Sequence, residues 1–101
     1  MKLYTINIPL SIGQGAVPAA KINSYERTAL SVFGSYFKAT TQIMVRNKVS
    51  EDALIKETFG IFALTVPSHN LDPVKDFAEL IKHDIGADGI DIIVSADVVI
   101  V

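Results

Sequence analysis

Two carboxylates, Glu57 and Asp91, are the side chains of this chain best suited to chemistry at a defined site. Each lies in a segment with the pattern of a β-strand and shares one side of that strand with apolar residues. A pair of carboxylates in a partly apolar setting can hold a cationic or hydroxyl-bearing ligand. The plainer interpretation is that Glu57 is a solvated charge beside Lys56 and that Asp91 protects a sheet edge from aggregation.

Other site chemistries have less support in the sequence. The two histidines, His69 and His83, lack the HxH, HxxxH or His–carboxylate spacing of a metal site, so no metal is expected and both are interpreted as surface residues. The chain has no cysteine, which excludes a thiol nucleophile, a thiolate metal site and a disulfide framework. Gly13-Gln14-Gly15 lacks the rest of a dinucleotide or phosphate-loop motif, and no Gly-x-Ser-x-Gly elbow is present. No cofactor is therefore expected.

The composition favours one small domain that associates with itself. The chain has 101 residues, of which 50% are hydrophobic and only 20% are charged, an apolar excess for so short a chain. Some of that apolar surface should contact another subunit. The net charge of −2 and the scattered bases give no footprint for nucleic acid. The first residues lack the apolar region of a signal peptide and no run could span a membrane, so a cytoplasmic protein is expected.

Six segments carry the periodicity of regular secondary structure. Strand patterns have a period of two, whereas in helical patterns apolar residues recur every three or four positions. In chain order the segments are Leu3–Leu10 (strand), Pro18–Phe33 (helix), Tyr36–Arg46 (strand), Leu54–Val66 (strand), Asp72–Ile85 (helix) and Ile90–Val94 (strand). The second half of Leu54–Val66 is almost unbroken in apolar residues, so we expect this strand to be buried on both faces and to organise the fold.

Several residues mark the ends of the two helices. Gly34 is expected to stop the first helix, because glycine takes the left-handed conformation without a steric penalty. That helix begins either at the start of its segment or later, with Asn23 or Ser24 as its cap. The pair Asp72-Pro73 predicts the start of the second helix, with Asp72 as N-cap and Pro73 at the first helical position.

The element order β-α-β-β-α-β predicts a ferredoxin-like fold, which is an α+β sandwich with a four-stranded antiparallel sheet and two helices on one face. Residues 1–101 would form a single domain. The alternative is a small three-layer α/β domain. The short polar connection Asn47–Asp52 decides between them, because a loop without a helix forces its two strands to be antiparallel. We expect a longer hairpin loop there, and a bend or bulge at Ser95–Asp97.

The sheet face that the helices do not cover is expected to associate with another copy of the chain. Apolar residues dominate its centre, and a large apolar patch on a small protein usually marks an interface or a ligand site. The strands of Glu57 and Asp91 flank the first strand in a ferredoxin-like sheet, so both acids are expected to face Asn7. The apolar run Asp97–Val101 is a further candidate for pairing with another subunit's sheet edge. The ligand-binding candidates on this face are Asn7, Gln42, Met44 and Phe59.

Four segments give the chain a resemblance to a known family. They are Gly34–Met44, Ile55–Glu57, Phe77–Lys82 and Asp88–Val94. In layout and element order, over most of the chain, they resemble the small phage S-adenosylmethionine lyases and related ferredoxin-like domains. The resemblance implies a trimer that binds S-adenosylmethionine between subunits and degrades it without a cofactor, with the substrate's own carboxylate as the nucleophile.

The same resemblance assigns roles to the two acids. Glu57 matches the acid on the family's third strand, and Asp91 matches the acid on the fourth, which is more often a glutamate. The aromatic-rich segment of the family's second strand is replaced here by Gln42-Ile43-Met44. Two hypotheses follow. The chain is either a homo-oligomeric domain with a small-ligand site, or a lyase acting on S-adenosylmethionine at a subunit boundary, with Glu57 and Asp91 orienting the sulfonium.

Overall fold

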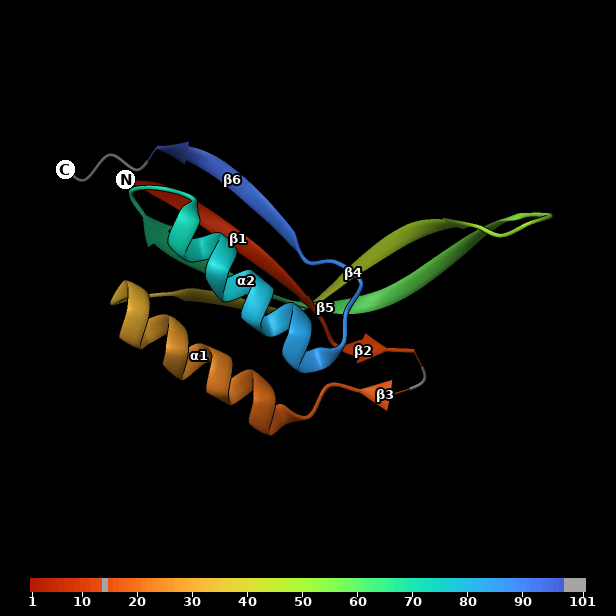
Figure 1. Ribbon diagram of the computed structural model, residues 1–101, viewed down its shortest axis with the longest axis horizontal. Helices are drawn as coiled ribbons and strands as arrows, with labels where there is room; N and C mark the ends of the chain where they lie inside the picture. The colour runs from red at the N-terminus through yellow and green to blue at the C-terminus, as the bar shows by residue number, and fades with distance from the viewer. Residues whose placement is uncertain (14, 98–101) are drawn as a thin grey trace.

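The architecture is a pair of helices packed on an antiparallel sheet, as given by a computed structural model that describes residues 1–13 and 15–97 (Figure 1). The α+β class predicted from the sequence is confirmed. In chain order the elements are β1 (Lys2–Pro9), β2 (Ser11–Ile12), β3 (Gly15–Ala16), α1 (Ala19–Phe33), β4 (Phe37–Val49), β5 (Leu54–Ser68), α2 (Asp72–Ile85) and β6 (Asp91–Asp97).

The main sheet is built around β5 and β1. Over the described residues its strand order is β4-β5-β1-β6, every neighbouring pair is antiparallel, and β2 and β3 form a separate two-stranded ribbon. β5 therefore has a strand on each side, as expected for the organising segment. Its residues Ile61–Leu64 are all buried, which confirms the prediction that this strand is buried on both faces in its middle.

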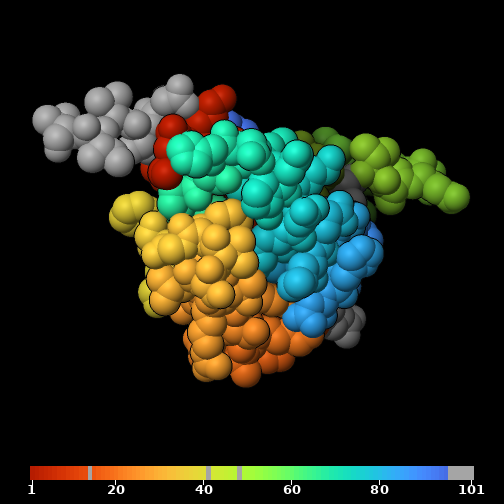
Figure 2. Space-filling model, turned by 60° about the vertical axis from the view of Figure 1, so that its left-hand side comes forward, coloured from red at the N-terminus to blue at the C-terminus, as the bar shows by residue number. Residues whose placement is uncertain are grey.

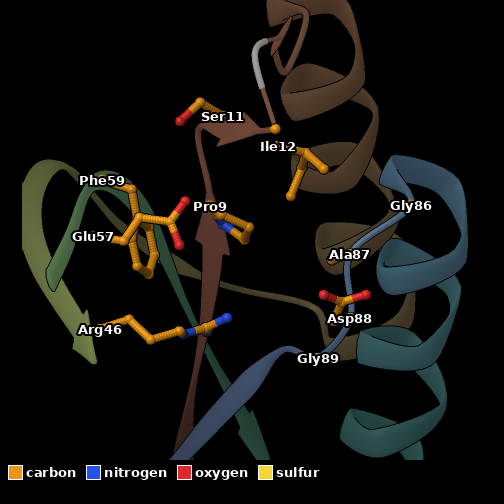
Figure 3. Close-up of a pocket in the computed structure, with 11 residues that line it drawn as sticks. Pro9, Ser11, Ile12, Arg46, Glu57, Phe59, Gly86, Ala87, Asp88 and Gly89 are labelled. Carbon is orange, nitrogen blue, oxygen red and sulfur yellow. The ribbon is translucent and has the colours of Figure 1, made fainter. Parts of the chain in front are cut away.

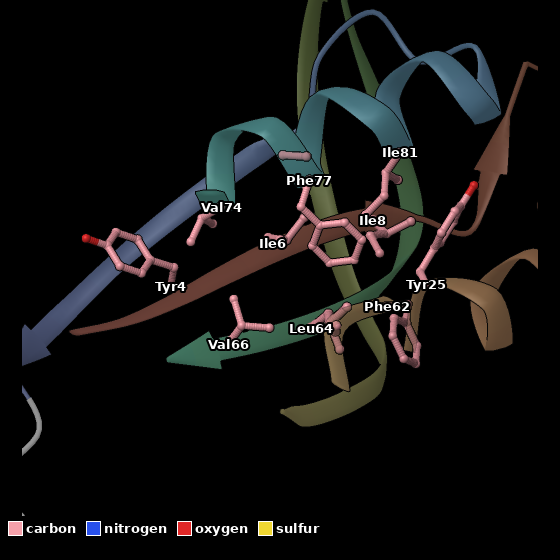
Figure 4. Close-up of a cluster of buried hydrophobic side chains, with 12 residues drawn as sticks. Tyr4, Ile6, Ile8, Tyr25, Phe62, Leu64, Val66, Val74, Phe77 and Ile81 are labelled. Carbon is pink, nitrogen blue, oxygen red and sulfur yellow. The ribbon is translucent and has the colours of Figure 1, made fainter. Parts of the chain in front are cut away.

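The hydrophobic core lies between the sheet and the two helices. Figure 2 shows α1 and α2 side by side as a continuous layer, and Figure 4 shows the strand side chains that they cover. Alternation sends every second residue of β1 and β5 to the helix side, where the apolar stripes of the helices meet them. Full burial of one such large side chain contributes about 1.5–3 kcal/mol. The buried members are Tyr4, Ile6, Ile8, Tyr25, Ala29, Phe62, Leu64, Val66, Val74, Phe77, Ala78 and Ile81.

The first helix ends where the sequence predicts. Gly34 caps it in the left-handed conformation, with a φ of 80° that favours glycine. At its other end the helix begins at Ala19, directly after an extended Pro18. The alternative of a later start, with Asn23 or Ser24 as the cap, is therefore wrong.

The start of α2 corrects another prediction. The N-cap residue is Leu71 and Asp72 is already helical, so the assignment of Asp72 as N-cap is wrong, and Pro73 takes the second helical position instead of the first. The capping role passes to Asn70, whose Oδ1 accepts a hydrogen bond from the Asp72 N–H at 3.1 Å. Asp72 still favours the helix start, because its carboxylate lies in the first turn, at the positive end of the helix dipole.

A bulge interrupts β4 near its start. Ala39 pairs with Ala63 and Gln42 pairs with Ile61, so β4 spends one residue more than β5 over this stretch. As a result Ala39 and Gln42 point to the same side of the sheet. The uninterrupted alternation predicted for Tyr36–Arg46 is therefore wrong at this point.

A second irregularity lies on β6. The bend or bulge predicted at Ser95–Asp97 is confirmed, because the pairing of β6 with β1 shifts register there. The Ser95 hydroxyl donates a hydrogen bond to the carbonyl of Leu3 at 2.8 Å. Of the apolar run Asp97–Val101 that was predicted to pair with another subunit, all residues after Asp97 lie outside the described part of the chain.

β1 ends before β5 does, so one part of β5 has no β1 beside it. The pairing of β1 with β5 reaches Pro9, after which the Leu10 N–H donates to the Gly60 carbonyl at 2.9 Å. A Cβ at Gly60 would lie 3.3 Å from Cδ1 of Leu10, so a glycine lets the end of β1 pack closely on β5.

Past this point β4 and β5 continue as a projecting hairpin in which they pair only with each other, as the right-hand side of Figure 1 shows. The pairing extends to Val49 opposite Leu54. The strand thus runs three residues beyond the predicted end at Arg46, and the connection is shorter than the predicted Asn47–Asp52 loop. A long stretch of two-stranded ribbon therefore stands clear of the helices.

A hydrogen-bond network joins α1 to the end of α2. The buried Tyr25 donates its hydroxyl hydrogen to the Asp84 carboxylate, and Lys21 Nζ donates to the Asp84 carbonyl at 2.8 Å. Burial of the ring, together with the nearby carboxylate, raises the pKa of Tyr25 well above its ordinary value. The hydrogen bond from Tyr25, with the charge of Lys21 in support, lowers the pKa of Asp84 below its ordinary value of 3.8.

Replacing Tyr25 with Phe should therefore change both the stability and its pH dependence. Because the pKa of Asp84 is lower in the folded chain than in the unfolded chain, the interaction stabilises the fold above the unfolded pKa. This stabilisation is lost as the pH falls through the folded pKa. We expect Tyr25→Phe to lower the Tm by a few degrees at neutral pH and to flatten the loss of stability between about pH 5 and pH 3.

Thermal unfolding followed by circular dichroism over this pH range measures both effects. The control is Tyr4→Phe, which removes a hydroxyl from another buried tyrosine of the same core and should leave the acid dependence intact. An acid dependence in Tyr25→Phe equal to that of the unmodified chain would contradict the role assigned to this hydrogen bond.

Candidate functional site

The sheet face opposite the helices, which we call the uncovered face, combines one side of all four strands of the main sheet. No helix in the described ranges lies on it (Figure 1). Directly paired residues of antiparallel strands point to the same side, so the register arranges this face in rows that cross the sheet. Its members include Thr5, Asn7, Pro9, Phe37, Ala39, Gln42, Met44, Arg46, Glu57, Phe59, Ile61, Ala63, Thr65, Asp91 and Ile93.

One row crosses all four strands with apolar ends and a polar middle. It runs from Ile93 on β6 through Thr5 and Thr65 to Phe37 on β4. The two threonine hydroxyls share a hydrogen bond of 2.8 Å. At the ends, Ile93 is 54% exposed and Phe37 is 66% exposed. The row thus presents two large apolar side chains on either side of a satisfied polar pair.

The next row holds two of the predicted site residues. It runs from Asp91 through Asn7 and Ala63 to Ala39. Asn7 is only 8% exposed, and within residues 1–13 and 15–97 its Oδ1 has no hydrogen-bond partner. Asp91 lies directly opposite Asn7 on the neighbouring strand. The structure therefore brings Asp91 beside Asn7, as expected from the sequence.

Glu57 lies elsewhere on the uncovered face. It is six residues along β5 from Ala63, the partner of Asn7, which corresponds to about 20 Å of strand. It belongs to the projecting hairpin, where its cross-strand partner is Arg46. The expected convergence of Glu57 and Asp91 on Asn7 is therefore not found within one chain.

A cleft of about 110 Å³ lies where the hairpin leaves the body of the protein (Figure 3). Glu57, Phe59 and Arg46 border it from the hairpin, and the loop after α2 borders it from the opposite side with Asp88. The Arg46 guanidinium lies over the Phe59 ring, 5.2 Å from the ring centroid. The other lining residues are Pro9, Ser11, Ile12, Gly13, Gly86, Ala87 and Gly89.

The remaining ligand-binding candidates continue the row pattern beside this cleft. Met44 pairs directly with Phe59, and Gln42 pairs with Ile61 one step further toward the body. The predicted residues therefore separate into two groups on one face, with Gln42, Met44, Phe59 and Glu57 along the hairpin, and Asn7 and Asp91 on the central and opposite strands.

Sequence reasoning missed Arg46 and Asp88 as cleft residues. The signal for Asp88 was its position in the glycine-flanked connection between the second helix and the last strand. The signal for Arg46 was its charge, but its place opposite Glu57 depends on the hairpin register and on the bulge. The cleft therefore offers a small ligand group the Phe59 ring, two carboxylates and the guanidinium of Arg46.

The cleft of one chain is small for a whole ligand. Pockets that enclose a small molecule are typically of ~300–1,000 Å³, whereas this one has about 110 Å³. It can therefore hold part of a ligand, such as a cationic group between the acids and the ring. A larger ligand would need surface from elsewhere, and a second subunit is the natural source.

The histidines take no part in the cleft. Both His69 and His83 are exposed, as predicted, and His83 Nε2 lies 3.7 Å from the Glu79 carboxylate on the outer side of α2. Across the described residues, no three His, Cys, Asp or Glu side chains are grouped so that they could hold a metal ion. Neither α1 nor α2 has the length and hydropathy of a membrane-spanning helix.

Comparison with known proteins gives no relative: no protein-family model matches the chain, and no curated protein matches it. We therefore infer a function from the geometry of the uncovered face and of the cleft.

Reversing the charge of Glu57 should destabilise the hairpin. Glu57→Lys places two positive charges directly opposite each other, because its partner is Arg46, and we expect a loss of about 0.5–1 kcal/mol in the free energy of unfolding. Urea unfolding at a fixed protein concentration measures it. The control is Lys56→Glu, which reverses a charge at the adjacent position opposite the neutral Asn47 and should have a smaller effect. Equal losses in the two variants would contradict a pairwise interaction between Glu57 and Arg46.

Proposed function

We propose that this chain is a ferredoxin-like domain that forms a homo-oligomer through its uncovered face, with the cleft at the border of that face as a site for a small ligand. The fold assignment is supported by the strand order β4-β5-β1-β6 together with the two helices on one side of the sheet. The exposure of large apolar side chains on the uncovered face carries the functional proposal.

Exposed apolar residues lie at both margins of the uncovered face. Phe37 and Ile93, at opposite ends of one row, are more than half exposed in the single chain. Between them lie Thr65 and Thr5, and the neighbouring positions Ala63 and Ile61 are already buried in the single chain. Large apolar side chains that remain exposed often mark an interface, because their burial removes apolar surface from water.

The polar residues of the same face fit an interface as well. Thr5 and Thr65 satisfy each other, so covering them does not leave two unpaired hydroxyl groups. Asp91 lies at the margin, where a charge can remain solvated or meet an opposite charge. The exposed apolar side chains of this face thus lie at its margins and its central polar groups are paired or buried, whereas the sequence had predicted a centre dominated by apolar residues.

Light scattering on the purified protein tests this proposal. We expect a mass that is a multiple of the chain mass. We also expect Phe37→Glu to shift the protein toward the monomer, because it places a charge in a row of side chains that the interface would bury. The matched control is Leu80→Glu, since Leu80 is exposed to a similar degree but lies on α2. A monomer at all concentrations, or equal effects of the two variants, would remove the proposal.

A second function, degradation of S-adenosylmethionine, is favoured by the composition of the cleft. The sulfonium is a cation, and the cleft places the Glu57 carboxylate and the Phe59 ring together; the sulfonium would take the place of the Arg46 guanidinium that now lies over this ring. In this reaction the substrate's own carboxylate oxygen attacks the carbon attached to sulfur. The carbon–sulfur bond breaks, and its electron pair neutralises the sulfonium to a thioether.

The protein's contribution would be positioning and electrostatics. No proton has to be taken or given in the bond-breaking step, so the site needs a fixed orientation of the substrate chain more than an acid or a base. Glu57 would orient the sulfonium. Asp91 is too far along the sheet of the same chain to share that task, so it would have to come from a neighbouring subunit.

Incubation of the purified protein with S-adenosylmethionine tests the second function. We expect methylthioadenosine and homoserine lactone as products, and a rate lowered at least tenfold in Glu57→Gln. Glu51→Gln, in the hairpin connection, removes an exposed acid away from the cleft and should leave the rate unchanged. If the unmodified protein forms neither product, the lyase function is excluded and the assembly function stands alone.

A further inference from the structure

We propose that the outer edge of β4 pairs, antiparallel, with the outer edge of β6 in a second copy of this chain, in the register that places Arg46 opposite Asp91. This inference rests on the proposed self-association and adds a second contact, between sheet edges, to the one through the uncovered face. The occupant of the edge is a second copy, because the two edges of one molecule are opposite in charge and both carry apolar side chains beside that charge.

The two edges are available for such a contact. The strand order places β4 and β6 at the two ends of the main sheet, and within the described residues neither has a strand on its outer side. β4 is a long strand whose projecting part carries Ile43 and Val45 on the helix side, 74% and 58% exposed, and Met44 on the uncovered face. An exposed edge of this kind is a template for another strand.

The charges of the two edges are complementary. The charged residues of β4 are all basic, whereas those of β6 are both acidic. Lys38 on β4 already forms an ion pair of 3.1 Å with Glu26 of α1. Arg46 is exposed and lies in the regular part of the strand after the bulge. Pairing of β4 with a second β4 would set bases against bases, which favours the head-to-tail arrangement.

In one register, every residue of the regular part of β6 meets a β4 residue that suits it in charge or polarity. With Arg46 opposite Asp91 of the second copy, Met44 meets Ile93 on the uncovered face. On the helix side, Val45 meets Ile92 and Ile43 meets Val94. The pairs follow from the faces that the intramolecular registers assign to each residue.

Neighbouring registers are poorer. A shift by two residues in one direction sets Met44 against Asp91, and a shift in the other direction sets Arg46 against Ile93. A shift by one residue would pair a residue of the uncovered face with one of the helix side, such as Arg46 with Ile92, which the pleat of an antiparallel pair does not allow. The register with Arg46 opposite Asp91 thus joins apolar side chains to apolar ones and the base to the acid.

This contact would also complete the cleft. Glu57, Arg46 and the second copy's Asp91 would form one row across three strands, which brings the two acids to about 10 Å from each other, two strand spacings apart. Beyond Arg46 the hairpin would run beside Gly89 and Ile90 of the second copy, next to the loop that borders that copy's cleft. The contact is head-to-tail, so its repetition closes a ring when the rotation allows.

Engineered cysteines test the register directly, because the natural chain contains no cysteine. We expect the double variant Met44→Cys with Ile93→Cys to form disulfide-linked oligomers on mild oxidation, seen on a non-reducing gel. Each single variant should remain unlinked. The control is the double variant Val45→Cys with Ile93→Cys, in which the side chains would point to opposite faces and should not link.

The outcomes separate the pairing from the proposed self-association. If light scattering gives an oligomer but the first double variant does not link, the edge pairing is wrong and the association through the uncovered face remains. Linking in Met44→Cys alone would show two-fold β4 pairing, and linking in the control would show another register, and either result overturns the inference. A monomer in light scattering removes both.

Charge reversal gives a second measurement that does not depend on disulfide geometry. Arg46→Asp and Asp91→Arg should each weaken association roughly two- to five-fold, as expected for a cross-strand pair of opposite charge. The double reversal should restore most of the loss. Losses that simply add in the double variant would contradict a direct contact between these residues.

Discussion

Two helices can cover only one side of a four-stranded sheet, and this constraint governs the rest of the structure. The covered side is satisfied by alternation, because β1 and β5 send their larger aliphatic residues to the helices, which bury them almost completely. The uncovered face carries the alternate residues of the same strands, which the helices do not contact. Here these positions carry apolar residues at the margins and a few paired or buried polar groups, so the single chain leaves part of its hydrophobic surface in water.

The cleft arises because β1 is shorter than β5. Because β1 ends at Pro9, with Leu10 packed against Gly60, the continuation of β5 has only β4 as a neighbour. A two-stranded ribbon is at best marginally stable in water. At the point where the third strand is missing, the hairpin, the end of β1 and the loop after α2 enclose the cleft. The site is therefore a consequence of where one strand stops.

The two helices, the four longer strands and the helix-facing core could be predicted from the sequence because they depend on local periodicity. The buried middle of β5, the stop at Gly34 and the irregularity at Ser95–Asp97 are examples, whereas the two-residue strands β2 and β3 were not predicted. The N-cap of α2 was predicted wrongly, because Asp72 is a favourable cap residue by type, whereas the chain enters the helix at Leu71 and Asn70 accepts the hydrogen bond from the Asp72 N–H.

The site was harder to predict than the fold for a physical reason. The face on which a strand residue lies is assigned by counting from a known pair. The bulge of β4 therefore moves every residue before it to the opposite face of the sheet, and no glycine in the sequence marks its position. Position along the face depends on strand length, which no local pattern gives. The same-side assignment of Glu57 and Asp91 therefore agreed with the register, whereas their meeting at Asn7 did not.

The two edges of the sheet differ in how they are protected, and this difference is the strongest reason to expect a partner. β6 is short, carries acids at both ends and is distorted by its bulge, all of which discourage indiscriminate pairing. The bulge of β4 lies near its start and leaves the longer, projecting part regular, with exposed apolar residues on its helix side and Met44 beside Arg46 on the uncovered face. An isolated molecule would gain nothing from such an edge and would risk aggregation. A specific partner strand with one acid placed to meet Arg46 turns the same edge into a selective contact, because other registers and other strands leave that charge against an apolar residue.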